Sequence, residues 1–248
     1  MTRASTHPSL SNRRHEELLR WSTKIITFLN NLTTEQPVDD RRVRNAAMPF
    51  QAFTRAKALV FVFRRKWGFL GSFQSEIGFI TKKLTDEHGN IRWSAPIFTK
   101  GSSIGMGLTV GRLQSGMCLA LMNDEALAGA SKATFRVGFK GQFLIDMDGA
   151  YLRAVRLDST SQEDNVIIDG AGGMLAKYFR MEAMIVDFSM EFISVSQNKD
   201  ANRRLYGNDY KVEDVLNGME EVPIEFNGVI DLLNRLAEAG RQKKGQRN

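Results

Sequence analysis

The sequence predicts an α+β fold: an antiparallel, glycine-bearing and strongly bent, barrel-like β-sheet flanked by N-terminal amphipathic helices and a C-terminal helix. Three observations support this prediction. Residues 13–32 repeat their apolar side chains at helical spacing. The stretch from residue 58 to residue 193 is rich in β-prone segments that contain glycines. Residues 224–239 return to helical spacing.

The first helix, residues 13–32, is amphipathic. Between Glu16 and Leu32 the apolar side chains fill one half of the helical projection, and only Ser22 interrupts that half. Such a face either packs on the domain core or lies in the interface of a bilayer. In the second case the inserting side chains are Leu18, Trp21, Ile25, Phe28 and Leu29.

The remaining elements follow from breaks and caps along the chain. Pro37 and Asp39-Asp40 end the first helix and start a second one over Arg41–Thr54. Asn123 caps a short helix that ends at Ala130, and Gly240 stops the last helix. The turn His88-Gly89-Asn90 joins two of the strands. Strands are expected at residues 58–64, 69–81, 91–96, 105–111, 117–122, 134–138, 143–157, 166–168 and 183–193.

Composition narrows the class of protein. The chain has 248 residues, one cysteine and three histidines. The single Cys118 rules out an internal disulfide, and its apolar neighbours indicate a buried strand residue. The scattered histidines form no zinc-ligand cluster, so we expect neither metal nor cofactor. No apolar run approaches the ~20 residues of a membrane span, and no signal peptide or lipid anchor is recognisable, so we expect a cytoplasmic protein.

The charge distribution is polarised. The net charge is +6, but residues 1–66 hold 13 basic and 5 acidic side chains, and residues 241–248 hold four more basic ones. A basic front and tail around an acidic middle favour an anionic partner. We divide the chain into a flexible lead-in at residues 1–12, a single domain at residues 13–240 and a basic tail at residues 241–248.

Two motifs stand out. Trp93-Ser94-Ala95-Pro96 precedes glycines at 101, 105, 107 and 111, which allow strands to approach closely or bend. The second motif is Asp200–Gly207, in which Asp200-Ala201-Asn202-Arg203 is expected to cap and fix the helix that follows a long strand, with Arg203 bonding back to the sheet. Neither motif supplies a nucleophile, a metal cage or a phosphate loop.

These motifs belong to a longer series of matching points, whose order and spacing resemble the SYLF family, also called the Ysc84-type actin-binding or lipid-binding domain. The resemblance spans about residues 13–240. Its points are Met48-Pro49, Ala56–Leu59, Gly68–Leu70, Gly78, Trp93–Pro96 with the spaced glycines, Asn123, Tyr178, Ser189–Glu191, Asp200–Arg203 with Tyr206-Gly207, and Asp214–Leu216.

The resemblance implies a peripheral membrane module without catalytic activity. Such a module binds phosphoinositides through its N-terminal amphipathic helix and adjacent basic residues, and some fungal members also bind actin filaments. An alternative is therefore an actin- or cytoskeleton-binding adaptor that uses the same basic surface. The basic residues expected to contact lipid headgroups are Arg13, Arg14, Arg20, Lys24, Arg41, Arg42 and Arg44.

The chain resembles a divergent member of this family. Gln74-Ser75-Glu76 stands where the family usually has an arginine followed by small residues, and Met181-Glu182-Ala183 replaces Ser-Arg-Gly. Residues 158–170 look like an insertion.

Two other function classes are disfavoured. Enzymatic activity is suggested only by carboxylates on predicted strands, which are usually solvated, and no base, nucleophile or cofactor motif accompanies them. Nucleic-acid binding is not expected, because the basic front lacks interleaved aromatic residues and the middle of the chain is acidic. The carboxylates concerned are Asp146, Asp148, Asp187 and Glu191.

Overall fold

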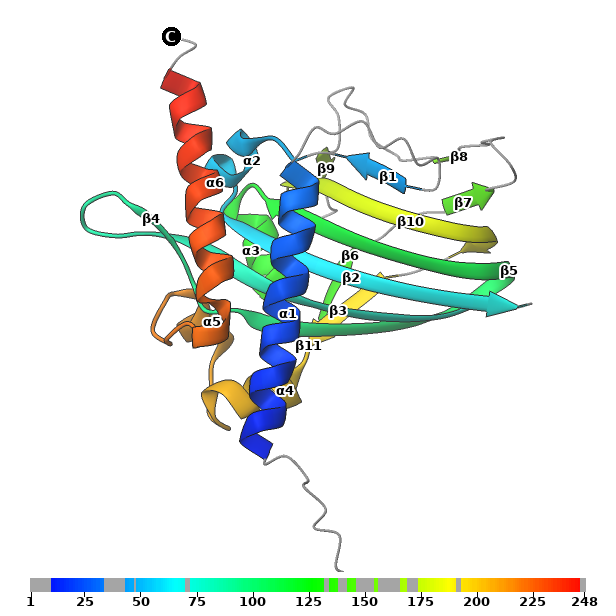
Figure 1. Cartoon of the computed structure of the whole chain (residues 1–248), viewed down its shortest axis with the longest axis horizontal. Coiled ribbons are helices and arrows are strands. Elements are labelled where there is room, and N and C mark those ends of the chain that lie inside the picture. The colour runs from blue at the N-terminus through cyan, green and yellow to red at the C-terminus, as the bar shows by residue number, and fades with distance from the viewer. Residues whose placement is uncertain are drawn as a thin grey trace, which may run out of the picture.

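In the computed structural model, helices and strands of an α+β fold are arranged as shown in Figure 1. The structure describes residues 10–33, 43–46, 48–69, 72–131, 134–137, 142–145, 154–155, 166–168, 174–190 and 193–245. Of the helices in these ranges, none is both long enough and apolar enough to cross a bilayer.

Two long helices lie side by side across one face of the sheet (Figure 1). They are α1 (Leu10–Thr33), which matches the predicted amphipathic helix, and α6 (Asn227–Gly245). Shorter helices surround them: α2 (Phe50–Arg55), α3 (Asp124–Ser131), α4 (Lys199–Tyr206), α5 (Val212–Leu216) and the 3-10 turn η1 (Ile224–Phe226).

The described strands form one antiparallel sheet in which the order β4-β3-β2-β5-β10-β7-β8 can be followed from edge to edge. An antiparallel sheet between helices is therefore confirmed. The sheet is not closed, so the barrel-like form stays a prediction. The strands are β1 (Val43–Ala46), β2 (Ala58–Phe69), β3 (Ser72–Thr85), β4 (Ile91–Trp93), β5 (Ile97–Leu121), β6 (Thr134–Val137), β7 (Gln142–Ile145), β8 (Ala154–Val155), β9 (Val166–Ile168), β10 (Met174–Met190) and β11 (Ile193–Gln197).

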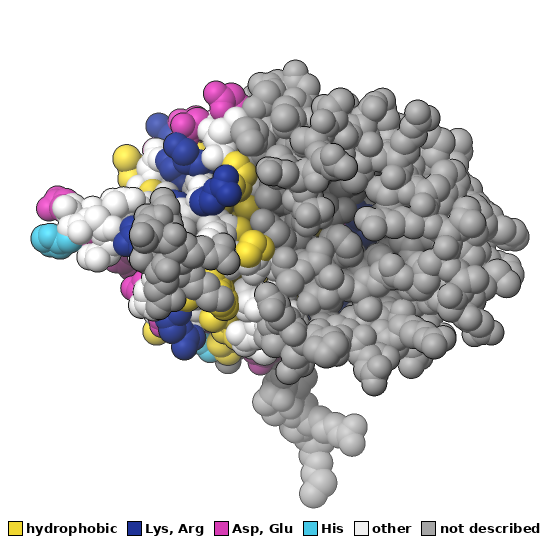
Figure 2. Space-filling view, turned by 90° about the horizontal axis from the view of Figure 1, so that it is seen from above, with side chains coloured by type: hydrophobic (Ala, Val, Ile, Leu, Met, Phe, Trp, Pro, Cys, Tyr) yellow, Lys and Arg dark blue, Asp and Glu magenta, His cyan; other side chains and the backbone are white. Residues whose placement is uncertain are grey.

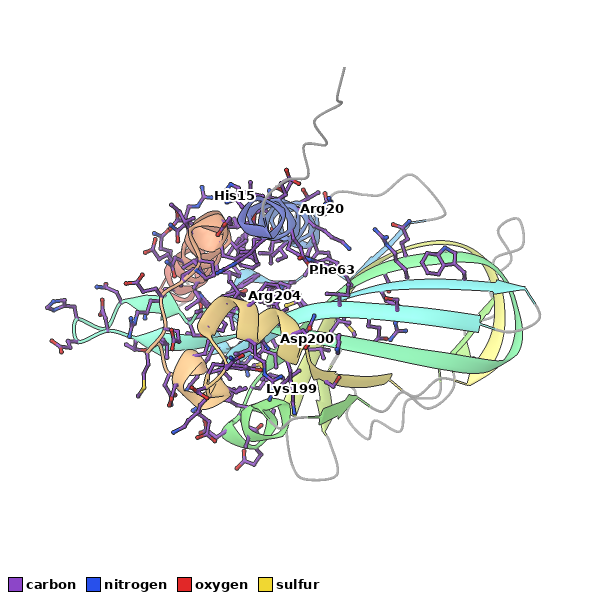
Figure 3. The ribbon with its side chains drawn as sticks, turned by 90° about the horizontal axis from the view of Figure 1, so that it is seen from below. His15, Arg20, Phe63, Lys199, Asp200 and Arg204 are labelled. Atoms are coloured by element: carbon purple, nitrogen blue, oxygen red, sulfur yellow. The ribbon has the colours of Figure 1, made fainter. Side chains whose placement is uncertain are left out.

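One strand, β5, serves both halves of the sheet. Its first part pairs with β3 up to Gly105, and its second part pairs with β2 from Val110 onward. Two separate strands, 105–111 and 117–122, are predicted from the sequence, but Ile97–Leu121 forms one continuous strand. Gly105 and Gly107 fall where β5 passes from pairing with β3 to pairing with β2. Figure 3 shows that the strands curl over at the end of the sheet that lies far from the helices.

The sheet carries apolar side chains on both faces, since successive strand residues point to opposite sides. One face packs against α1, α2 and α6 through residues such as Phe61 and Phe79, whose rings stack at 4.7 Å. The other face packs against α3 and α5. Cys118 lies in the first core, as predicted, and burial raises the pKa of its thiol.

The predicted helix at Arg41–Thr54 is wrong over its first half. Residues Val43–Ala46 form β1, which pairs antiparallel with β10, and the helix α2 begins only after Pro49. Pairing with a strand far along the chain outweighs local helix propensity here. Arg41 and Arg42 lie outside the described residues.

The predicted stop at Gly240 is also wrong, since α6 continues to Gly245. Gly240 is buried where α6 crosses α2, and a Cβ at this position would collide with the carbonyl oxygen of Phe50 and with Thr54 Oγ1. The hydroxyl of Thr54 also donates to the carbonyl of Ala237 at 3.1 Å. Gly240 is therefore needed for close helix packing rather than for helix termination.

The two sequence motifs meet in space. The Tyr206 hydroxyl donates to the carbonyl of Pro96 at 2.7 Å. Buried Asn202 accepts from the Phe98 N–H at 2.8 Å and donates to the Phe98 carbonyl at 3.0 Å. Asn198, not Asp200, caps α4 by accepting from the Ala201 N–H.

The expected bond from Arg203 to the sheet is not the link between the motifs, because Arg203 is exposed and Asn202 fills that role. Within the first motif, buried Ser94 accepts from the Lys82 N–H, and its carbonyl accepts from Thr81 Oγ1. Both motifs thus hold the fold together.

Candidate functional site

The apolar face of α1 is packed on the sheet. Phe28 lies edge-on to Phe61 and Phe63, with ring centroids 6.4 and 5.4 Å away. It reaches the strand beneath because Gly116 has no side chain: a Cβ there would lie 2.6 Å from Phe28 Cε2. Of the two interpretations of the amphipathic helix, packing on the core is the one seen in the structure.

The side chains expected to insert into a bilayer are accordingly buried in the protein. Ile25 and Leu29 are fully buried, and Leu18 and Phe28 are 6% exposed. Trp21 is half-buried against the same core. Insertion of these residues would require α1 to leave the sheet, at a cost of about 1.5–3 kcal/mol for each large side chain exposed on the way.

The exposed edge of α1 carries a cation between two aromatic rings. Lys24 Nζ lies 5.0 Å from the ring centroid of Trp21 and 4.3 Å from that of Phe63. The two rings are 5.9 Å apart. Partial burial lowers the pKa of Lys24, and the nearby charge of Arg65 lowers it further. The position therefore combines cation–π contacts with a concentration of positive charge.

This arrangement continues along β2 beyond the helix. Arg65 and Trp67 follow Phe63 at every second position, so they share its face of the sheet. Arg65 is exposed and Trp67 is 43% exposed. Figure 3 shows Arg20 on α1 and Phe63 on the strand below it, where the sheet extends past the helix. We call this surface the aromatic–basic patch; it consists of Arg20, Trp21, Lys24, Phe63, Arg65 and Trp67.

Three more of the predicted basic residues lie on described elements, and Arg41 and Arg42 lie outside the described residues. Arg14 is exposed near the start of α1, and Arg13 precedes it in the same helix. Arg44 lies on β1. Of the predicted site residues that the structure describes, the patch brings together Arg20, Trp21 and Lys24.

A second group of cations lies where α2, β3 and α6 meet. Half-buried Lys83 donates to the Thr54 carbonyl, Arg241 donates to the Gly89 carbonyl at 3.1 Å, and Lys57 pairs with Asp124 at 3.0 Å. Burial and the charges of Arg241 and Lys57 lower the pKa of Lys83. Figure 2 views this end of the molecule, with Lys and Arg side chains among hydrophobic ones. Because these cations already bind groups of the protein, we regard the aromatic–basic patch as the candidate site.

The divergent Glu76 has a structural partner. Its Oε1 lies 2.9 Å from Arg64 Nε, directly across β2 and β3, and both side chains are buried. The departure from the family pattern at this position therefore neutralises a buried arginine.

The carboxylates considered as catalytic candidates form no site among the described residues. Asp146, Asp148 and Glu191 lie outside the described residues, and Asp187 lies on β10. Across the described part of the chain, no group of three or more His, Cys, Asp or Glu side chains could hold a metal ion.

The chain matches a known protein family. A family model described as "Ysc84: Las17-binding protein actin regulator" matches residues 102–236, which is more than half of the chain. The chain belongs to the Ysc84 family. The family assignment that the sequence motifs suggested is thereby confirmed.

Relatives from animals and yeast agree with the Ysc84 assignment. "SH3 domain-containing YSC84-like protein 1" of Rattus norvegicus and of Homo sapiens are each 23% identical over 97% of this chain. "Protein YSC84" of Saccharomyces cerevisiae is 25% identical over 77% of this chain and 38% of its own length. The chain spans 64% of the length of the two mammalian proteins. No solved structure shows a significant match.

Three residues of the patch were missed by the sequence analysis: Phe63, Arg65 and Trp67. The predicted strand ended at residue 64, where a run of basic residues begins. The alternation Phe61, Phe63, Arg65, Trp67 continues the period of two beyond that point and is the signal that could have extended it.

Proposed function

We propose that this Ysc84-family domain is a non-catalytic binding module of actin regulation, which docks an acidic surface of the actin filament at the aromatic–basic patch. The observation that carries the proposal is Trp67, exposed on β2 on the same face of the sheet as Arg65 and as Phe63, whose ring contacts Lys24. The description of the family as an actin regulator supports the choice of partner.

The residue types of the patch are suited to binding a partner protein. Tryptophan and arginine are the residues most often found as anchors of protein interfaces. Cations around such an anchor accelerate association with an acidic partner and fix its orientation. Lys24 is held between Trp21 and Phe63, so it loses little freedom on binding.

Co-sedimentation with actin filaments tests this proposal. We expect Arg20→Gln combined with Arg65→Gln, or Trp67→Ala alone, to weaken filament binding about tenfold, since each change removes a contact of about 1 kcal/mol or more. The matched control is Arg203→Gln with Arg204→Gln, which removes the same charge from exposed positions on α4. Equal weakening by both double variants would contradict docking at the patch.

A second candidate function is binding of phosphoinositide headgroups at the same patch, at the cytoplasmic surface of a membrane. It is favoured by Trp67, because tryptophan suits the interface between headgroups and acyl chains. Arginine can bond two phosphate oxygens at once, and each cation near an anionic leaflet contributes about 1 kcal/mol. In this proposal α1 stays packed on the sheet and the charged patch contacts the headgroups.

The direction in which one substitution changes vesicle binding separates headgroup docking from insertion of α1. Phe63→Ala weakens the packing of α1 without changing α1 itself, because Phe63 contacts Trp21, Lys24 and Phe28. With α1 packed, we expect vesicles of phosphatidylcholine and a phosphatidylinositol bisphosphate to bind this variant no more tightly than the wild type. Tighter binding, together with faster amide hydrogen exchange in α1, would instead support insertion of Leu18, Trp21, Ile25, Phe28 and Leu29.

A further inference from the structure

A groove of about 730 Å³ lies on another side of α1. One wall is the start of α1, where His15 Nδ1 lies 2.7 Å from Glu225 Oε1 of η1. The other wall is the segment that joins α5 to η1, and α4 contributes part of the lining. We call it the acidic groove; it is lined by Arg14, His15, Leu205, Tyr206, Met219, Glu220, Glu221, Val222, Pro223, Ile224 and Glu225.

The acidic groove exposes large apolar side chains. Met219 is 72% and Ile224 is 76% exposed, the highest values for large hydrophobic side chains in the described part of the chain. Leu205 and Val222, also in the lining, pack against the protein core. Exposed apolar side chains that gather at one concave surface mark an interaction site rather than ordinary surface.

The charge of the groove is opposite to that of the patch. The lining of the groove holds three carboxylates, Glu220, Glu221 and Glu225, against one arginine, Arg14, and His15. Burial raises the pKa of Tyr206, the charge of Glu220 raises it further, and the charge of Arg14 lowers it. A surface of this sign repels anionic lipids and acidic proteins and attracts cationic segments.

We propose that the acidic groove binds a peptide segment of a partner protein in which an apolar side chain is flanked by lysine or arginine. The apolar side chain lies between Met219 and Ile224, and the flanking cations pair with Glu220 and Glu221. Charge complementarity excludes the ligands proposed for the patch, so the domain joins two partners of opposite charge through two separate surfaces.

Fluorescence anisotropy with a defined probe tests this inference. The probe is a fluorescein-labelled synthetic peptide in which leucines are flanked by lysines, and its matched controls carry glutamate for lysine or serine for leucine. We expect the probe to bind and both controls to bind at least tenfold more weakly, by roughly 1.4 kcal/mol. Equal binding of the probe and the glutamate peptide would overturn the proposal.

Variants of the protein locate the binding site. We expect Glu220→Gln with Glu221→Gln, and separately Met219→Ser with Ile224→Ser, to weaken probe binding about tenfold. The control, Asp231→Asn with Glu238→Gln, removes the same charge from exposed positions on α6 and should change it less than about twofold. If the control variant lost as much probe binding, the attraction would come from the overall charge of the protein, and the groove would not be the binding site.

Two further readouts keep the result unambiguous. Met219 and Ile224 are highly exposed, so their serine variants should fold, and binding to filaments or vesicles through the patch should be unchanged. Failure at the groove is thus distinguishable from failure at the patch. Sedimentation equilibrium shows whether the chain self-associates. If it does, and if Glu220→Gln with Glu221→Gln abolishes the self-association, the groove binds a second copy of the chain and the proposal of a peptide occupant is overturned.

Discussion

Replacing Asn202 with alanine is expected to lower the free energy of unfolding by about 2–4 kcal/mol. The Asn202 side chain is fully buried and makes two hydrogen bonds to the backbone of Phe98. Alanine would leave the Phe98 N–H without its acceptor in a site that water does not reach. An unpaired buried donor alone costs about 1–3 kcal/mol, and the lost side-chain volume adds to this.

Urea unfolding followed by circular dichroism measures this change. The neighbouring variant Arg203→Ala is the control, because Arg203 is exposed and its loss should cost less than about 0.5 kcal/mol. Equal stability of the two variants would mean that the Asn202 bonds do not hold α4 to β5.

Two glycine-to-alanine substitutions in the same helix are expected to have opposite effects. Gly240→Ala should destabilise the fold by about 3 kcal/mol, because the new Cβ collides with the backbone of Phe50 and forces α2 and α6 apart. Gly228→Ala should stabilise it by about 0.5 kcal/mol: the new Cβ would meet only Ile26 Cδ1, at 3.4 Å, and alanine favours a helix over glycine.

Thermal unfolding of the two variants alongside the wild type provides the measurement. The difference in sign is informative, since both substitutions add the same methyl group to α6. Gly240→Ala with wild-type stability would show that α2 can move away from α6 at little cost.

Local signals predicted much of the fold. The apolar spacing of α1 and the strand β9 at residues 166–168 agree with the structure. The cap of α3 agrees as well, since Asn123 Oδ1 accepts from the Ala126 N–H. These features depend on residues close together in the chain, so patterns of spacing and capping suffice to find them.

Features that depend on distant contacts were not predictable in this way. The strand β1 exists because it pairs with β10, and β5 is continuous because two different strands support it. The role of Gly240 depends on a helix nearly two hundred residues earlier in the chain. A single sequence does not state which segments meet.

The candidate site was likewise predicted only where it depends on local sequence and not where it depends on distant contacts. Trp21, Arg20 and Lys24 were named from the helix alone, but the sequence left open whether the helix packs inward. The answer depends on Gly116 and Phe63, which receive Phe28 on the sheet. Once α1 is packed, the exposed residues next to it on β2 become part of the candidate site, and Leu18, Ile25, Phe28 and Leu29 become core.

The bonds from α4 to β5 also constrain how the chain folds as it is synthesised. Asn202 and Tyr206 reach partners 104 and 110 residues earlier in the sequence. The Trp93–Pro96 turn therefore leaves the ribosome long before the helix that completes it. Contacts of such large sequence separation slow folding, and the parts of the sheet that α4, α5 and α6 cover stay exposed in the meantime. We therefore expect the nascent chain to be more prone to aggregation during this interval than a domain built from local contacts.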